Sequence, residues 1–497
     1  MTVLCALLIL ICGVLYCYQQ SRERKRKLAA LLPGKLPLPI IGNALHFRDK
    51  STFKVLLKVI DRYGPTCKFW LGSKLFVLIT SPEDVKTVLL NSDSVTRDQF
   101  MMSVLRPFTG DGLITSSGNT WKQHRRIMRP VFHSKILLQY VPVFHRNAKI
   151  LTDSLADSAN GLVFNVYPYI AECTLNMICE TALGTTPSKL NPGFAKSFLR
   201  GLHIIEERIA RPWLLINWLF RLSKLGQEQD TIMKMMDNTT NHEISKLLRS
   251  QTNISENNRA EEDSITNSLN VLVKSTGREN SIVNEEFLRD EINTLLIAGQ
   301  ETTATIMSFA LVLLGIHQDI QETVYKELQD IFQDDPSAEI TINHLNQMKQ
   351  LDCVLKETLR LFPAAPIVTR ELSKETDINN YTLPAGCTAL IVSYKAHRNP
   401  QQFPNPEHFD PARFSPEAHH PYAYIPFGGG PKICIGQKYA MIQMKTVLSH
   451  VLRHYKVFPG CTRESLQDLQ MGMVLRPTSG FRLALQVRKY VNTGELS

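Results

Sequence analysis

The sequence IPFGGGPKICIGQKYA, residues 425–440, is the most informative stretch of the chain. Phe427, Gly430, Cys434 and Gly436 follow the spacing F-x-x-G-x-x-x-C-x-G. Glycines allow a sharp turn and a close approach to a flat ligand. Backbone N–H groups and a helix N-terminus stabilise a thiolate, the form of cysteine that binds a metal. The alternative is a buried free cysteine in a glycine-rich turn, but this spacing favours a ligand of haem iron.

Composition indicates a large globular chain. Of its 497 residues, 43% are hydrophobic and 21% are charged, which are normal values. The ten cysteines form no C-x-x-C pair. This argues against a disulfide framework and against a zinc site, and it fits a reducing compartment.

The N-terminus predicts a membrane anchor. Thr2–Tyr18 is an unbroken apolar run, and the cationic stretch SRERKRK follows it rather than preceding it. A cleaved signal peptide carries its positive charge first, so we expect a retained signal anchor over residues 1–20. A basic and proline-rich hinge follows over 21–43, and the catalytic domain is expected over 44–497. The formal net charge of +10 is explained partly by this cluster. No nucleic-acid-binding motif accompanies it, so no nucleic acid partner is expected.

The pattern of the chain predicts a mainly α fold with a smaller β region (α+β). A β-hairpin is expected over 68–80, with its turn at Gly72–Ser73. Helical periodicity dominates over 136–249, and a polar loop is expected over 250–264. The apolar segment 198–225 is either buried core or a surface element that dips into a membrane.

Two helices carry candidate site residues. Asn119 or Thr120 can cap a helix that places Trp121 and Arg125 on one face. An anion beside them would give this face a function; otherwise it is an ordinary amphipathic helix. A long apolar helix over 284–318 contains Glu301 and Thr302, and a hydroxyl there can bond the carbonyl four residues back. The alternative is a satisfied core threonine with a solvated glutamate.

A further helix over 351–363 places Glu357 and Arg360 at i and i+3, where they can pair. Buried, such a pair is costly to break and suits a structural clamp. Arg413 in FDPARF can join it. The apolar stripe over 436–455 predicts a core-facing helix after the cysteine loop.

Together, WKQHR, AGQETT, E-T-L-R, PARF and the cysteine loop resemble, in this order, the cytochrome P-450 superfamily of haem-thiolate monooxygenases. The resemblance covers nearly the whole chain. The phrases TSSGNTWKQHRRIMRPVFH and CVLKETLRLFPAAPIVTRE are similar to the animal microsomal family-4 clan, and we expect an arthropod type.

The resemblance implies roles for matching positions. Cys434 would be the axial thiolate ligand of iron. Glu301 and Thr302 would be the acid–alcohol pair that delivers protons to iron-bound oxygen. Phe427 would shield the sulfur side of the ring at the Gly430 turn. The propionates would be held by Trp121, Arg125, Arg370 and Lys432.

Two positions depart from the pattern of the family. Lys432 stands where the family usually has arginine; it keeps the charge but loses the bidentate fork. Ala298 stands where many family-4 members have the glutamate that forms an ester to haem. The expected cofactor is therefore haem b held without a covalent link to this helix.

The resemblance also implies partners and a location. One atom of O2 would enter a small apolar substrate, which would be a lipid, a hormone or a xenobiotic such as an insecticide. Electrons would come from NADPH through a reductase, with cytochrome b5 as an optional donor. The acidic surface of the reductase could dock on six cations, which are Lys122, Arg125, Arg126, Arg129, Lys432 and Lys438. The location would be the endoplasmic reticulum membrane, facing the cytosol and in contact with lipid. The alternatives are a haem-thiolate isomerase or dehydratase and a non-catalytic haem or lipid binder.

Overall fold

A long apolar helix, α15 (Glu285–Ile316), forms the core of the helical part of the protein. Its N-cap residue is Asn284, whose side chain accepts a hydrogen bond from the backbone N–H of Phe287 (2.8 Å). By length and composition α15 is the one helix of the described residues that could cross a membrane, but 83% of its apolar window is buried inside the protein. It is therefore the core helix that the sequence predicts over 284–318.

The computed structural model describes residues 23–47, 51–91, 96–191, 193–253, 267–276, 283–333, 335–415 and 419–488. The predicted anchor over 1–20 lies outside these residues. The chain forms two compact units. Unit 1 takes the chain up to Asp98, with Ile367–Ala396 and His420–Ile433. Unit 2 takes Gln99–Pro366, His397–His419 and the chain from Cys434 onward.

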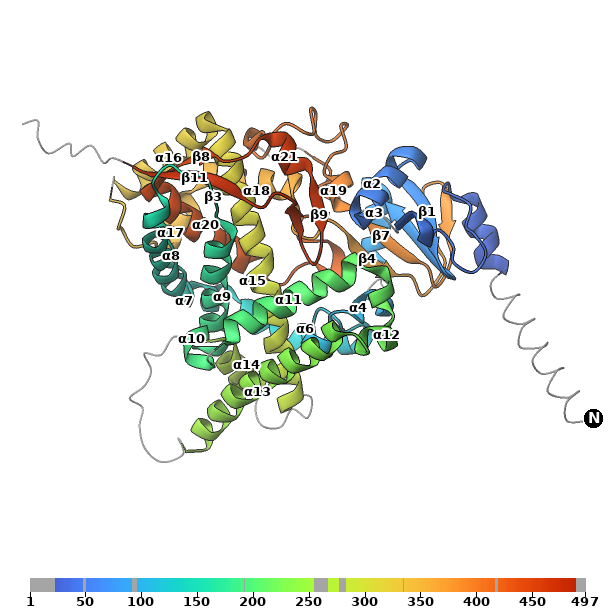
Figure 1. Ribbon diagram of the computed structural model, residues 1–497, viewed down its shortest axis with the longest axis horizontal. Helices are drawn as coiled ribbons and strands as arrows, with labels where there is room; N and C mark the ends of the chain where they lie inside the picture. Colours follow the sequence, from blue (N-terminus) through green and yellow to red (C-terminus); the bar gives the residue numbers. More distant parts are fainter. Residues whose placement is uncertain are drawn as a thin grey trace, which may run out of the picture. The chain divides into compact units, whose positions relative to one another are not determined.

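Unit 2 is helical. In it α15 packs against α9 (Tyr167–Leu183), α13 (Lys224–Asn253), α18 (Lys349–Leu361) and α20 (Gln437–His454) (Figure 1). The other helices are α4 (Gln99–Met102), α5 (Arg106–Thr109), α6 (Gly118–Met128), η3 (Arg129–Phe132), α7 (Ser134–Gln139), α8 (Val141–Leu155), η4 (Ala156–Ser158), α10 (Pro187–Leu190), α11 (Phe194–Ala210), η5 (Pro212–Leu215), α12 (Asn217–Arg221), α14 (Ser268–Thr276), α16 (Gln318–Phe332), α17 (Ile342–Gln347), η6 (Pro411–Arg413) and α21 (Arg463–Gln467).

Unit 2 also has two small sheets. One has the order β3-β11-β8 and is antiparallel throughout. The other is the antiparallel pair β9–β10. Its strand β10 carries Arg476, whose side chain contacts Glu301 of α15 and Glu206 of α11. Their strands are β3 (Phe164–Asn165), β8 (Tyr455–Pro459), β9 (Leu469–Met471), β10 (Leu475–Pro477) and β11 (Arg482–Val487).

Unit 1 is built on a four-stranded sheet of order β1-β2-β7-β4. The predicted hairpin is confirmed, because β1 pairs antiparallel with β2 across Gly72–Ser73. The central strand β2 is buried along nearly its whole length and runs parallel to β7. The elements are a helix over 23–31, η1 (Ala44–Phe47), β1 (Thr66–Leu71), β2 (Lys74–Ile79), α2 (Thr52–Tyr63), α3 (Pro82–Leu90), β4 (Val368–Glu371), β5 (Thr376–Ile378), β6 (Tyr381–Leu383), β7 (Thr388–Ile391), α19 (Ser393–Ala396) and η7 (Gly430–Lys432).

The predicted fold class, mainly α with a smaller β region, is confirmed, and two predicted boundaries are wrong. Helix α6 begins at Gly118, with Ser117 as its N-cap residue, rather than after Asn119 or Thr120. Helix α13 continues to Asn253, past the start of the loop predicted over 250–264. Helix ends fray and vary by one or two residues, which covers the shifted start of α6.

The apolar segment 198–225 is divided between core and surface. Phe198 and Phe220 are buried, which supports the interpretation as core. Trp218 and Leu222 are 66% and 74% exposed. These two side chains therefore lie on the surface, and insertion of this segment into a membrane stays a prediction.

Candidate functional site

Cys434 lies in unit 2, three residues before α20. Of the described cysteines it is the one whose side chain is exposed. Burial nevertheless raises its pKa, while the backbone N–H of Gly436 and the charge of Arg125 lower it. The thiol is therefore accessible at the surface of unit 2, while its surroundings disfavour the charged form. A coordinated metal ion would deprotonate such a thiol.

Helix α6 brings two predicted residues to the same unit. Trp121 is buried, and Arg125 is half-buried one turn later. Burial lowers the pKa of Arg125, and nearby Cys434 raises it. A cation of this helix therefore lies close enough to the cysteine to interact with it, and its role toward a propionate stays a prediction.

The glycines of the loop have a packing role that the sequence did not indicate. Gly430 has a φ of +66°, and a Cβ atom there would lie 2.1 Å from the carbonyl oxygen of Leu89. A Cβ at Gly429 would lie 2.9 Å from the Leu89 side chain. Within unit 1, the loop therefore rests directly on the last turn of α3. Close approach to a flat ligand was the predicted reason, but packing against α3 already requires Gly430.

Three cations converge in unit 1. Burial lowers the pKa of Arg370 to about 9, and the charge of Arg97 lowers it further. Burial together with Arg97 and Arg370 lowers the pKa of Lys432 to about 6. The Nε atom of Arg370 is buried and makes no hydrogen bond. Such a cluster is costly unless an anion compensates it.

Arg97 was missed in the sequence. It stands alone in SVTRDQF, with no pattern that marks it as part of a site. Burial lowers its pKa to about 10. It joins Arg370 and Lys432 only because β4, η7 and the chain before Asp98 belong to one folded unit.

The hydroxyls of α15 make the bonds predicted for them. Thr302 Oγ1 donates to the carbonyl of Ala298, and Thr303 Oγ1 donates to that of Gly299, each at 2.8 Å. A Cβ at Gly299 would lie 2.7 Å from Ile178 of α9. The glycine therefore lets α9 approach α15 closely, one turn away from the hydroxyls.

Glu301 is not solvated, contrary to the alternative considered above. It is buried and accepts a hydrogen bond from the hydroxyl of Tyr167 (2.7 Å). It also forms an ion pair with Arg476 of β10. Arg476 donates to the Tyr167 hydroxyl (2.8 Å) and lies 3.5 Å from a carboxylate oxygen of Glu206 on α11. We call these four residues the Glu301 network.

No sequence pattern indicated the other three members of the Glu301 network. They come from α9, α11 and β10, far apart along the chain. Burial raises the pKa of Tyr167 to about 12, so its hydroxyl stays protonated and remains a donor. The buried carboxylate is thus compensated by one cation and one hydroxyl.

A second buried pair joins α6 to α15. His124 Nδ1 lies 2.8 Å from a carboxylate oxygen of Glu291, and the other oxygen accepts from the N–H of Leu113 (3.2 Å). Burial raises the pKa of Glu291, and His124 lowers it. Sequence reasoning missed this pair, although it fixes the helix that carries Trp121 and Arg125.

The predicted clamp is confirmed. The side chains of Glu357 and Arg360 are fully buried and pair at 2.7 Å, and Arg413 lies 3.3 Å from the same carboxylate. Arg360 also donates to three backbone carbonyls, those of His397 (3.0 Å), Pro406 (2.8 Å) and His408 (3.1 Å). The clamp therefore fixes the segment 397–413 to α18.

The six cations predicted to face a partner are not all on the surface. Lys122, Arg126, Arg129 and Lys438 are exposed and belong to unit 2. Lys432 is only 7% exposed and lies in the unit 1 cluster, so its place in the predicted docking face is wrong. We call the four exposed residues the basic face.

Comparison with known proteins decides the family. Residues 32–485 match the family model of cytochrome P450. The chain belongs to the cytochrome P450 family. Cytochrome P450 4V2 of Homo sapiens is 34% identical over 469 residues, covering 90% of this chain and 88% of that protein. Cytochrome P450 4c3 of Drosophila melanogaster is 34% identical over 494 residues (95% and 92%), and cytochrome P450 4c21 of Blattella germanica is 32% identical over 490 residues (96% and 97%).

This cytochrome P450 is a haem-thiolate monooxygenase, as the resemblance implied. Its cofactor is haem, whose iron takes a cysteine thiolate ligand. The residues present fit that group. Each unit, taken by itself, offers residues that suit a part of it. In unit 2 an exposed thiol beside a cation suits the iron. In unit 1 the desolvated cluster around Arg370, with its unbonded Nε, suits a carboxylate.

Proposed function

We propose that the protein is a membrane-bound monooxygenase that inserts one atom of O2 into a small apolar substrate, with electrons from NADPH through a reductase. Cys434 is the axial ligand in this proposal. The observation that carries it is the exposure of this one thiol, beside Arg125 and before α20, while Cys67, Cys173, Cys179, Cys353 and Cys387 are buried.

Further residues hold the cofactor. In unit 1, Arg370, Lys432 and Arg97 compensate propionate charge. In unit 2, Arg125 does so, and the indole N–H of Trp121 donates a hydrogen bond to a propionate. Phe427 and Gly430 shape the loop before the sulfur. Ala298 offers no carboxylate, so the porphyrin is bound without an ester to α15. When bound, haem supplies the activation of O2.

In this proposal, Glu301 and Thr302 deliver the protons that the reaction consumes. Thr302 rests on the Ala298 carbonyl, and rotation of its hydroxyl away from that acceptor frees it as a donor. Glu301 is held by Arg476 and Tyr167, so it must exchange one of these partners before it can relay a proton. The intact acid–alcohol pair favours oxygenation over rearrangement.

The proposed location is the endoplasmic reticulum membrane, with one anchor over residues 1–20 and the catalytic part facing the cytosol. The apolar run Thr2–Tyr18 and the cations after it support this. The basic face is the proposed contact for an acidic reductase. Fatty acids, hormones and insecticides are the proposed substrate classes.

Turnover of the full chain with NADPH and a cytochrome reductase tests this proposal. We expect oxygenated product from a lipid or xenobiotic library, formed only with O2. The Thr302→Ala variant should still consume NADPH but release peroxide, with product falling by ~100-fold. The control Thr303→Ala, which removes the neighbouring hydroxyl, should keep product coupled to NADPH. A rearranged product formed without NADPH would contradict the proposal.

A further inference from the structure

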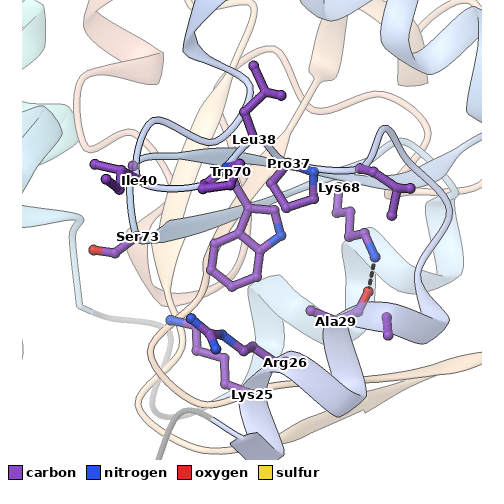
Figure 2. A pocket seen from close by; sticks show the side chains of 13 residues that line it. Lys25, Arg26, Ala29, Pro37, Leu38, Ile40, Lys68, Trp70 and Ser73 are labelled. Carbon is purple, nitrogen blue, oxygen red and sulfur yellow. Dashed lines mark hydrogen bonds between the residues drawn. The ribbon is translucent and has the colours of Figure 1, made fainter. Parts of the chain in front are cut away.

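A cavity of about 610 Å³ lies entirely within unit 1, between the helix over 23–31 and the hairpin β1–β2 (Figure 2). Its volume is that of a site for a drug-sized ligand. No carboxylate lines it. Its lining residues are Lys25, Arg26, Ala29, Ala30, Leu36, Pro37, Leu38, Pro39, Ile40, Lys68, Trp70, Gly72 and Ser73.

Lys68 is the unusual residue of this cavity. It is only 6% exposed, and burial lowers its pKa. Its ammonium group donates to the carbonyl of Ala29, which Figure 2 marks, and no described carboxylate pairs with it. An ammonium group has three donors, and a buried cation without a counter-ion is unfavourable. A bound anion would therefore stabilise the charged Lys68 ammonium group.

Two more cations, both on the helix over 23–31, line the cavity. Arg26 is exposed, and Lys25 donates to the carbonyl of Gly386 (2.7 Å). The other described cations of this helix are used elsewhere, since Arg24 pairs with Glu375 (2.6 Å) and Lys27 pairs with Glu23 (2.7 Å). The cavity thus collects Lys25, Arg26 and Lys68, and its thirteen lining residues include no aspartate or glutamate.

The remaining wall is apolar and open. Leu36 is 83% exposed and Ile40 is 93% exposed, and Leu38 is half-exposed. Ile40 also has a φ of +65°, a conformation that a β-branched residue rarely adopts. Strained backbone and a contiguous exposed apolar surface both point to a contact that the isolated chain lacks.

We propose that this cavity binds one anionic phospholipid. Its phosphate and acidic headgroup meet Lys68, Lys25 and Arg26, and its acyl chains run along Leu36, Leu38, Ile40 and the indole of Trp70. The proposal rests on the proposed membrane location, because the bilayer supplies the lipid. Cations near an anionic membrane surface contribute about 1 kcal/mol each, which corresponds to about a fivefold preference.

Quenching of tryptophan fluorescence by brominated lipid tests this site. The full chain is placed in nanodiscs of phosphatidylcholine that contain a small fraction of either dibromo-phosphatidylserine or dibromo-phosphatidylcholine. We expect stronger quenching by the serine lipid, and Trp70→Phe should remove that difference. Lys68→Met and Arg26→Gln should each reduce the selectivity about fivefold, while Lys68→Arg keeps it.

Lys27→Gln is the matched control, because it removes one cation from the same helix outside the cavity and should leave the selectivity unchanged. Equal quenching by the two lipids, or retained selectivity in Lys68→Met, would overturn the proposal. Loss of selectivity on adding inorganic phosphate would indicate a site for the free anion instead. Absence of all quenching would indicate another occupant, such as the chain's own apolar N-terminus.

Two readouts separate this proposal from the proposed function. Flotation with phosphatidylcholine vesicles reports membrane attachment whatever the headgroup, and NADPH turnover reports catalysis. If the protein floats and turns over but shows no lipid selectivity, the lipid site alone is wrong. Variants that fail to give the carbon monoxide spectrum of wild type are misfolded, and if Lys68→Met is among them, Arg26→Gln, a change at an exposed position of the cavity, carries the test.

Discussion

Arg476 stabilises the ionised form of the buried Glu301 carboxylate. The carboxylate is buried, and Arg476 is its cation, with the Tyr167 hydroxyl as the second partner. Without this cation the buried carboxylate has less compensation, which favours its neutral, protonated form. We therefore predict that Arg476→Gln moves the acid limb of the kcat–pH profile to higher pH.

The matched control is Arg482→Gln, which removes an exposed guanidinium from the neighbouring strand β11. It should leave the profile unchanged. An unshifted profile in Arg476→Gln, in a variant with normal haem content, would show that the network does not set the protonation of Glu301.

His397 should make the protein sensitive to acid. Burial lowers its pKa to about 3, even though the backbone carbonyl of Arg360, 3.2 Å from Nδ1, favours the protonated form. Between pH 6.5 and 3 the unfolded chain binds the proton that the folded chain rejects, so stability falls as pH falls. At pH 5 this costs about 2 kcal/mol relative to neutral pH.

We predict that His397→Gln makes the free energy of unfolding less dependent on pH between 7 and 5, as measured by urea denaturation. His203→Gln is the control, because the side chain of His203 is 61% exposed. If both variants keep the slope of wild type, His397 does not contribute the predicted acid sensitivity.

At the scale of elements, the clamp holds 397–413 against α18. Glu357 is shared by Arg360 and Arg413, and its removal leaves two guanidinium groups with less compensation. Breaking a buried pair from one side costs ~3–5 kcal/mol. We predict that Glu357→Gln loses that much stability and with it most of the bound haem.

Glu375→Gln is the comparison, since it breaks the pair with Arg24, a side chain that is 76% exposed. That change should cost ~1 kcal/mol or less. Equal losses in the two variants, measured by urea denaturation and haem content, would contradict the role of the clamp.

The elements also show what the sequence could predict. Helix α15, the clamp and the β1–β2 hairpin follow from short-range patterns, namely apolar periodicity, i,i+3 pairing and a Gly–Ser turn. Arg97, Glu206 and Arg476 could not be predicted, because each joins a site through contacts between segments distant in the chain. Lys432 was expected partly on the surface, but burial depends on packing rather than on residue type.

At the scale of the whole molecule, the basic face should govern association with the reductase. Lys122, Arg126, Arg129 and Lys438 are exposed on one unit. Charges at the rim of an interface change association rates and their salt dependence. We predict that Arg126→Glu with Lys438→Glu raises the KM for reductase and flattens its dependence on ionic strength.

The control is Lys27→Glu with Arg482→Glu, which makes the same change of net charge at exposed positions outside the basic face. An equal effect of both pairs on the KM for reductase would indicate general electrostatic attraction rather than a docking face.

The carbon monoxide difference spectrum of the reduced full chain tests the central claim most directly. Cys434 as axial thiolate predicts the red-shifted Soret band of thiolate-ligated haem, and Cys434→Ser should lose it. Cys461→Ser, a change at another accessible cysteine, should retain it. A Cys434→Ser variant with the unchanged band would contradict the assignment of the ligand and of the site built around it.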